Sequence, residues 1–414
     1  MHLSHEEEPA PVLAAPLADP QASPQADPLS ARQRFFSLAA VIWAMAMVTF
    51  IIGLTFPFLA LLLERQGVST AMIGYSTAVQ GMAILFIAPF APRLIAFMGP
   101  NWSMAVGMGG SALCIALLPL WPNVWAWFPL RFALGAVSSL LWIASEAWIN
   151  SVAREETRGR VVSVYSIAGA AGFTMGPAIL TLIGTQTNLP FLIAVTALVL
   201  PCLPLLLAPT AGITFEKTEK GGWGRVLALA PAPILITFIF AGSEEALHTF
   251  FAIFTMELGE GETLALRLIA ALGFGGIVLG YPIGWLADHV NRLNLLILLT
   301  LTIFAAILAV PQIFNVYPLN YIYFLVLGGI MGGTYTVGMT LLGERFEGAD
   351  LVTASTMTTT FWGVGAVAGP SLAGQSMGMM GPNGLIFAIC FVILLYLPFP
   401  LWERWRLLRP RART

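Results

Sequence analysis

The chain has 414 residues, of which 58% are hydrophobic, while its 19 basic and 21 acidic residues amount to only 10%. Soluble proteins carry about 25% charged residues, so this composition excludes a soluble globular enzyme. A net charge of −2 supplies no basic field for a nucleic acid. The three cysteines lie in apolar runs without C-x-x-C spacing, which indicates neither a disulfide framework nor a zinc site.

The N-terminal segment is predicted to be a disordered tail over residues 1–34. Residues 1 to 31 contain six prolines and the acidic run Glu6 to Glu8, and they have too few large apolar residues to form a core. A basic start and an apolar stretch, which a signal peptide needs, are missing. His2 and His5 beside the glutamates leave weak metal binding as an alternative to a solvated acidic tail.

Twelve apolar segments follow the tail, and each is long enough to span a membrane as a helix. A lipid-facing backbone must satisfy its own hydrogen bonds, and these segments are about twice the length of a barrel strand, so helices are required. We therefore predict an all-α polytopic membrane protein with twelve transmembrane helices. The segments are 36–62, 71–96, 102–120, 124–150, 161–184, 190–208, 229–256, 264–286, 294–313, 319–342, 351–376 and 384–401.

The longest polar connection divides the spans into two sets of six. We predict an N-terminal half over 35–208, a cytoplasmic linker over 209–228, a C-terminal half over 229–401 and a basic cytoplasmic tail over 402–414. With the N-terminus in the cytoplasm, 16 of the 19 Lys and Arg residues fall on the cytoplasmic side, and Arg65 and Arg267 fall on the opposite side. The positive-inside rule therefore places both termini in the cytoplasm.

A short motif repeats between the two halves at an offset of 193 residues. G-x-x-x-G-P occurs once in the fifth span and once in the eleventh span. Small residues at this spacing let two membrane helices approach closely, so the motif predicts equivalent helix packing in both halves. Its residues are Gly172, Gly176 and Pro177 in the first half and Gly365, Gly369 and Pro370 in the second half.

The fourth span carries two ionisable residues, Arg131 and Glu146, on one helical face. A charge at the bilayer centre costs at least ~2.5 to 3.5 kcal/mol, which makes such residues candidates for function. About 22 Å of helix rise separates the two, so they cannot pair with each other. An alternative for Glu146 is that it only anchors the end of its helix.

The seventh span carries Glu244, Glu245 and His248 near its middle, and this cluster is the strongest candidate site. Desolvation disfavours the charged form of a carboxyl group, so such a group can bind and release a proton near neutral pH. A static buried hydrogen-bond network is the alternative. A Glu-x-x-His pair also suggests a metal, but a di-iron centre needs a second such helix, and we predict no metal.

Six plus six spans joined by a polar loop resemble the major facilitator superfamily, and four motifs strengthen the resemblance. Gly284-x-Leu286-Ala287-Asp288-x-x-x-Arg292 resembles the cytoplasmic gate motif of that superfamily, and Arg93 is kept at the first-half counterpart, which lacks the aspartate. Arg131-x-x-x-Gly135 is similar to a motif associated with proton coupling. The motif at Gly172 resembles part of an antiporter motif. Glu146-Ala147-Trp148-Ile149-Asn150 resembles a bacterial subgroup known only as permeases.

The resemblance implies a secondary active transporter in the bacterial cytoplasmic membrane that works by alternating access. A proton-coupled antiporter for efflux is favoured, because of the partial antiporter motif and the acidic residues inside the membrane. Proton-coupled uptake of a small metabolite or organic anion, bound by Arg131, is the alternative. A sensor, scaffold or lipid-handling protein is an alternative from another class. Enzyme motifs such as G-x-S-x-G and H-E-x-x-H are missing, so we expect no enzyme, no cofactor and a monomer.

Overall fold

The structure is a computed structural model that describes residues 29–121, 123–210 and 222–408. Every regular element in these ranges is a helix. The elements are α1 (Ala31–Arg65), α2 (Thr70–Ile87), α3 (Ala91–Met98), α4 (Pro100–Leu117), a 3₁₀ turn (Leu118–Leu120), α5 (Val124–Val152), α6 (Arg158–Ile183), α7 (Leu189–Val199), α8 (Cys202–Leu207), α9 (Trp223–Leu229), α10 (Pro231–Glu257), α11 (Glu262–His289), α12 (Arg292–Ile313), α13 (Leu319–Arg345), α14 (Gly348–Met380), α15 (Asn383–Tyr396) and α16 (Pro398–Leu408).

Eleven candidate membrane spans and the long helix α14 account for most of the described chain. Eleven helical segments are long and apolar enough to cross a membrane. The remaining predicted span corresponds to α14, whose 33 residues include a stretch rich in threonine that lowers its hydropathy. Because α14 packs along α2 of the other half and along α10 of its own, much of it is shielded from lipid. The predicted fold class, an all-α polytopic membrane protein, is confirmed.

Three of the predicted spans are interrupted where proline removes a backbone donor. The segment 71–96 is divided into α2 and α3 around Pro89, so Arg93 lies on a short separate helix. Likewise, 190–208 is divided before Cys202, next to Pro201, and 384–401 is divided before Pro398. The other spans begin and end within a few residues of their predicted limits.

The predicted tails and linker overlap with helices at their edges. Helix α1 begins inside the predicted tail 1–34, because the Ser30 hydroxyl accepts from the Gln33 amide and the Gln33 side chain accepts from the Ser30 amide. Helix α9 lies in the predicted linker 209–228, and α16 extends into the predicted tail 402–414. Residues 1–28, 211–221 and 409–414 lie outside the described residues, and with them the metal alternative at His2 and His5.

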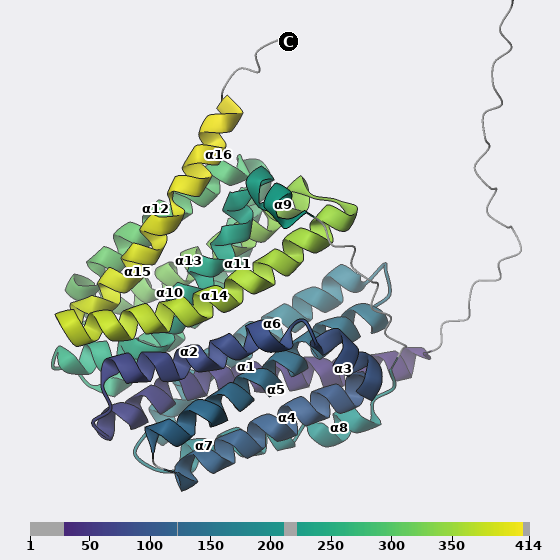
Figure 1. The fold of residues 1–414 in the computed structure, drawn as a ribbon, viewed down its shortest axis with the longest axis horizontal. Coiled ribbons are helices and arrows are strands. Elements are labelled where there is room, and N and C mark those ends of the chain that lie inside the picture. Colours follow the sequence, from purple (N-terminus) through teal and green to yellow (C-terminus); the bar gives the residue numbers. More distant parts are fainter. Residues whose placement is uncertain (1–28, 122, 211–221, 409–414) are drawn as a thin grey trace, which may run out of the picture.

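The helices form two bundles, α1 to α8 and α9 to α16, which lie side by side in Figure 1. Their internal packing is equivalent, since α1 packs on α6 as α10 packs on α14, and α2 packs on α5 as α11 packs on α13. The repeated glycines lie at these contacts. Gly172 and Gly176 lie against the backbone of α1, while Gly365 and Gly369 lie against the backbone of α10.

The two halves meet mainly through α2 against α14 and through α6 against α11. We call the side where α1 begins the tail face and the side where α1 ends the far face. Near the far face the backbones almost touch: a Cβ atom added at Gly374 would lie 2.4 Å from the Thr70 carbonyl oxygen. Towards the tail face the bundles diverge (Figure 1), so this conformation is closed at the far face.

Candidate functional site

Arg131 lies inside the N-terminal half with its side chain fully buried. Helix α5 directs it towards α2, where its Nε donates to Gln80 Oε1 at 3.3 Å and its Nη1 donates to Ser76 Oγ at 3.4 Å. Its Nη2 is buried and has no hydrogen-bond partner among the described residues. A buried donor without a partner is costly, so this guanidinium retains the capacity to bind one more acceptor.

Glu244 and Glu245 lie on α10 in the C-terminal half, and both side chains are half-buried. The Glu245 carboxyl interacts electrostatically with Arg131 of the other half and with Glu244 on its own helix. The fold therefore brings together three of the residues that the sequence singled out. Arg131 belongs to the N-terminal half and the two glutamates to the C-terminal half, so this interaction runs between the halves.

His248 is buried one turn further along α10, and its ring nitrogen contacts the helix backbone rather than a glutamate side chain. The Nδ1 atom lies 2.9 Å from the backbone oxygen of Glu244. The ring packs against Phe173 of α6, with 4.6 Å between ring centroids. His248 thus contacts the other half through an aromatic pair.

Glu146 lies further towards the tail face on α5, and its side chain is exposed. The Trp142 indole donates to Glu146 Oε1 at 2.8 Å. The carboxyl also interacts electrostatically with Tyr165 of α6 and with Tyr335 of α13 in the C-terminal half. Because Tyr335 belongs to the opposite bundle, Glu146 is on the side of α5 that faces between the halves.

No group of three or more His, Cys, Asp or Glu side chains is arranged to hold a metal ion in the part of the chain that the structure describes. Cys114, Cys202 and Cys390 are free thiols on three different helices.

The predicted gate residues lie at the tail face. Arg292 donates to Asp288 at 3.0 Å and to Glu344 at 2.9 Å, which connects the ends of α11, α12 and α13. All three side chains belong to the C-terminal half. Gly284 lies on α11, and Arg93 lies on α3 in the other half. The gate therefore joins helices within one half in this conformation.

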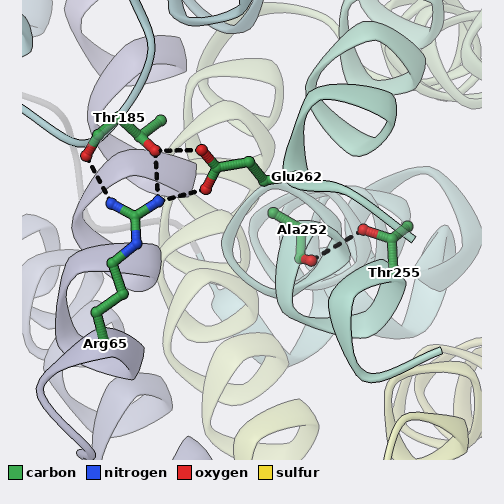
Figure 2. A network of polar contacts seen from close by, with 5 residues as sticks. All are labelled: Arg65, Thr185, Ala252, Thr255 and Glu262. Atoms are coloured by element: carbon green, nitrogen blue, oxygen red, sulfur yellow. Dashed lines mark hydrogen bonds and ion pairs between the residues drawn. The ribbon is translucent and has the colours of Figure 1, made fainter. Parts of the chain in front are cut away.

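At the far face, a network that the sequence did not suggest joins the two halves (Figure 2). Arg65 at the end of α1 pairs with Glu262 at the start of α11. Thr185 completes the network: its carbonyl oxygen accepts from Arg65 Nη1 at 2.6 Å, and its hydroxyl donates to Glu262 Oε1 at 2.6 Å. The only sequence signal was a basic residue on the side with few such residues.

Curated relatives of the chain are transporters without an assigned substrate. The chain is 23% identical over 352 residues to the uncharacterized transporter YfkF of Bacillus subtilis, which covers 82% of this chain and 88% of the relative. It is 26% identical over 305 residues to the uncharacterized transporter YcaD of Escherichia coli, which covers 72% and 75%. These relatives are described as transporters of the MFS type.

Solved structures show the same fold at low sequence identity. The nucleoside transporter NupG is 12% identical, has a TM-score of 0.68, and covers 91% of this chain and 100% of its own. A bacterial homolog of the human lysosomal transporter Spinster, inward-facing and occupied, is 13% identical with a TM-score of 0.70, and it covers 91% and 98%.

The model of one family matches almost the whole chain. The Major Facilitator Superfamily model matches residues 38–370 and, in a second match, residues 234–414. Together these matches include both six-helix bundles and every residue of the site between them. The chain therefore belongs to the Major Facilitator Superfamily, and it is a membrane transport protein rather than an enzyme.

Proposed function

We propose that this secondary transporter is a proton-coupled antiporter that exports a small molecule from the bacterial cytoplasm. In this proposal the tail face is cytoplasmic and both termini lie there, because Arg225, Arg292 and Arg345 join most other basic residues on that side. Residues 35–208 and 229–401 act as the two bodies that rock against each other as a monomer. Their packing through only a few helix pairs supports such a motion.

The observation that carries the proposal is the electrostatic interaction between Arg131 and Glu245, since each half contributes one partner. When the Glu245 carboxylate is charged, its attraction to Arg131 favours conformations that hold the two residues together. Protonation removes that attraction and also the desolvation cost of a buried charge. A proton on Glu245 or Glu244 therefore shifts the balance between conformations, which is how a gradient can drive alternating access.

The free Nη2 of Arg131 favours one other function, proton-coupled uptake of an organic anion. A carboxylate or phosphate group of a substrate would satisfy this donor with a charge-assisted hydrogen bond. The two functions differ in the charge of the substrate and in the direction of net movement.

The test is proton movement in everted membrane vesicles that hold an imposed pH gradient. A panel of small cations, neutral compounds and anions is added, and dissipation of the gradient is compared with vesicles that lack the protein. The antiporter predicts that at least one compound dissipates the gradient through the wild-type protein, and that Glu245→Gln abolishes this response. Glu257→Gln, on the far-face end of the same helix, is the matched control and should respond like the wild type.

Two results would count against the proposal. If neither Glu244→Gln nor Glu245→Gln reduces the response, the coupling site is elsewhere, and Glu146 is the next residue to test. If only anions move, and they move inward with protons, the protein is an importer.

A further inference from the structure

Three aromatic side chains gather in the C-terminal half without any sequence motif. Phe240 of α10, Tyr335 of α13 and Trp362 of α14 have ring centroids 5.0, 5.5 and 5.8 Å apart. The ring planes are inclined to one another by 38°, 42° and 80°, so the rings do not stack into one column. All three side chains are half-buried, which leaves part of their surface accessible.

One carboxyl group from each half interacts electrostatically with Tyr335 of this aromatic group. Glu244 follows Phe240 by four residues on α10, so both project from the same face of that helix. Tyr335 interacts electrostatically with Glu244 and also with Glu146 of the N-terminal half. Trp142 of the N-terminal half donates to the Glu146 carboxyl at 2.8 Å and is 39% exposed, so an aromatic residue accompanies the carboxyl group of that half as well.

The charge of this region is unbalanced. Arg131 interacts with Glu245 and is held by Ser76 and Gln80 on the side of α2. Arg131 therefore does not neutralise the carboxyl groups of Glu146 and Glu244. The aromatic residues do not neutralise them either, because their π-faces are also electronegative. A ligand that fits such surroundings carries a positive charge and an apolar body.

We propose that Trp142, Glu146, Phe240, Glu244, Tyr335 and Trp362, the aromatic-acidic cluster, bind a monovalent organic cation with a bulky apolar body. This inference rests on the proposed transport function and names the substrate class. The ring faces attract the cation, and the two carboxylates supply the opposite charge from the two halves. An anion of the same size is repelled by the same groups. A bound cation would touch both halves at once, as a transported substrate must.

The test is binding of tetraphenylphosphonium to the purified protein in detergent, with tetraphenylborate as the anion of matched size and shape. The proposal predicts that tetraphenylphosphonium binds, measured by titration calorimetry, and that tetraphenylborate, titrated in a separate experiment, does not. Trp362→Ala and Glu146→Gln should each weaken binding by roughly three- to thirtyfold, the range expected for loss of one cation–π or charge contact. Equal binding of both ions, or no binding of the cation, overturns the proposal.

Two further variants separate the cluster from general packing effects. Tyr335→Phe keeps the ring and should weaken binding less than Trp362→Ala does, so a loss as large as that of Trp362→Ala contradicts the cation–π account. Phe387→Ala removes an exposed ring that stacks on Phe391 in α15, a helix that contributes no residue to the cluster, and should leave binding unchanged. If it weakens binding equally, the ion binds the apolar surface in general. Each variant is used only if its melting midpoint without ligand matches the wild type; Trp362→Phe replaces Trp362→Ala otherwise.

The binding experiment and the vesicle experiment can give different outcomes, so failure of the cation site can be distinguished from failure of the proposed transport function. Cation binding that is lost in Trp362→Ala, together with no proton movement for any compound, refutes the antiporter and leaves the cluster as a cation site. Proton movement driven only by anions or neutral compounds, without binding of tetraphenylphosphonium, supports coupled transport and refutes the cluster as a cation site.

Discussion

Arg65 of α1 and Glu262 of α11 form an ion pair that joins the two halves at the far face, and Thr185 binds both partners (Figure 2). Both charged side chains are about one-fifth exposed, at 23% and 20%, so solvent screens them only in part. For the far face to open, α1 and α11 must separate and this network must break. The network therefore stabilises the conformation that is closed at the far face.

Glu262→Gln should shift the population towards conformations that are open at the far face. Loss of hydrogen bonds to a charged group costs about 1.5 to 3 kcal/mol, which corresponds to a shift of roughly tenfold or more. A cysteine pair at Thr70 and Gly378 reports the shift, since a Cβ atom at Gly378 lies 3.3 Å from Thr70 Oγ1 and the pair can oxidise when the far face is closed. Disulfide formation should slow in Glu262→Gln.

The matched control is Glu260→Gln, which removes a carboxylate two residues away, outside the network. It should leave disulfide formation unchanged. An unchanged rate in Glu262→Gln as well would show that the ion pair does not hold the far face closed.

The gate at the tail face predicts a shift in the opposite direction. Asp288→Asn removes one of the two carboxylates that bind Arg292 in this conformation, where the contacts stay within one half. The resemblance to the family's gate motif implies that these residues close the tail face in the alternate conformation, which the substitution should therefore weaken. Conformations open at the tail face should then be more populated, and the cysteine pair at Thr70 and Gly378 should oxidise faster than in the wild type. The effect should be small, below about 1 kcal/mol, because both carboxylates that bind Arg292 are largely exposed. A slower oxidation contradicts the gate.

The fold class could be predicted from the sequence because the length of an apolar segment, which decides whether it can span a membrane as a helix, depends on that segment alone. It also identified Arg131 and Glu245, since a charge inside an apolar run stands out in any single helix. Their interaction could not be predicted, because it depends on how the two halves face each other. Glu262 was missed for the same reason: it lies at a helix end, where charges are ordinary, and only the fold brings Arg65 to it.

The aromatic-acidic cluster was not predicted either. Phe240, Tyr335 and Trp362 come from three helices, and aromatic residues are frequent in apolar spans, so no spacing along the chain marked them. Polar residues in the second span, Ser76 and Gln80, did carry a signal. They are four residues apart on one helical face, a pattern that indicates a buried partner such as Arg131.

The orientation in the membrane is tested by labelling single cysteines. In a variant without the three native cysteines, a cysteine at Arg225 should react with an impermeant maleimide only from the cytoplasmic side. One at Glu260 should react only from outside. Reaction of either from the wrong side would reverse the proposed orientation, and with it the assignment of the tail face to the cytoplasm.

The repeated glycines predict a sharp difference between two alanine substitutions. A Cβ atom at Gly369 would lie 2.1 Å from the backbone oxygen of Gly242, and backbone cannot move aside at low cost. Gly369→Ala should therefore destabilise the protein by about 1 to 3 kcal/mol and lower its melting midpoint. Gly280→Ala, where nothing lies within 4 Å, is the control and should leave the midpoint unchanged or raise it. Equal midpoints would show that α10 and α14 are not packed so closely.

The last prediction concerns Arg131, whose removal should impair transport in every mode. Arg131→Ala leaves Ser76, Gln80 and Glu245 without their basic partner, so both gradient-driven transport and substrate exchange should fall. Arg131→Lys keeps the charge but cannot contact both α2 side chains with a planar fork, and it should recover only part of the activity. Arg267→Ala, at an exposed position on α11, is the matched control.

The double variant Arg131→Ala/Glu245→Gln separates charge balance from coupling. If the two residues compensate each other across the halves, the double variant should melt at a higher temperature than Arg131→Ala alone, because residue 245 no longer carries a carboxylate that has lost its counter-charge. It should still show no proton-driven transport, because the proton-binding carboxyl is gone. Additive losses of stability would mean that Arg131 and Glu245 act independently, and the interaction between the halves would then have to be sought at Glu244.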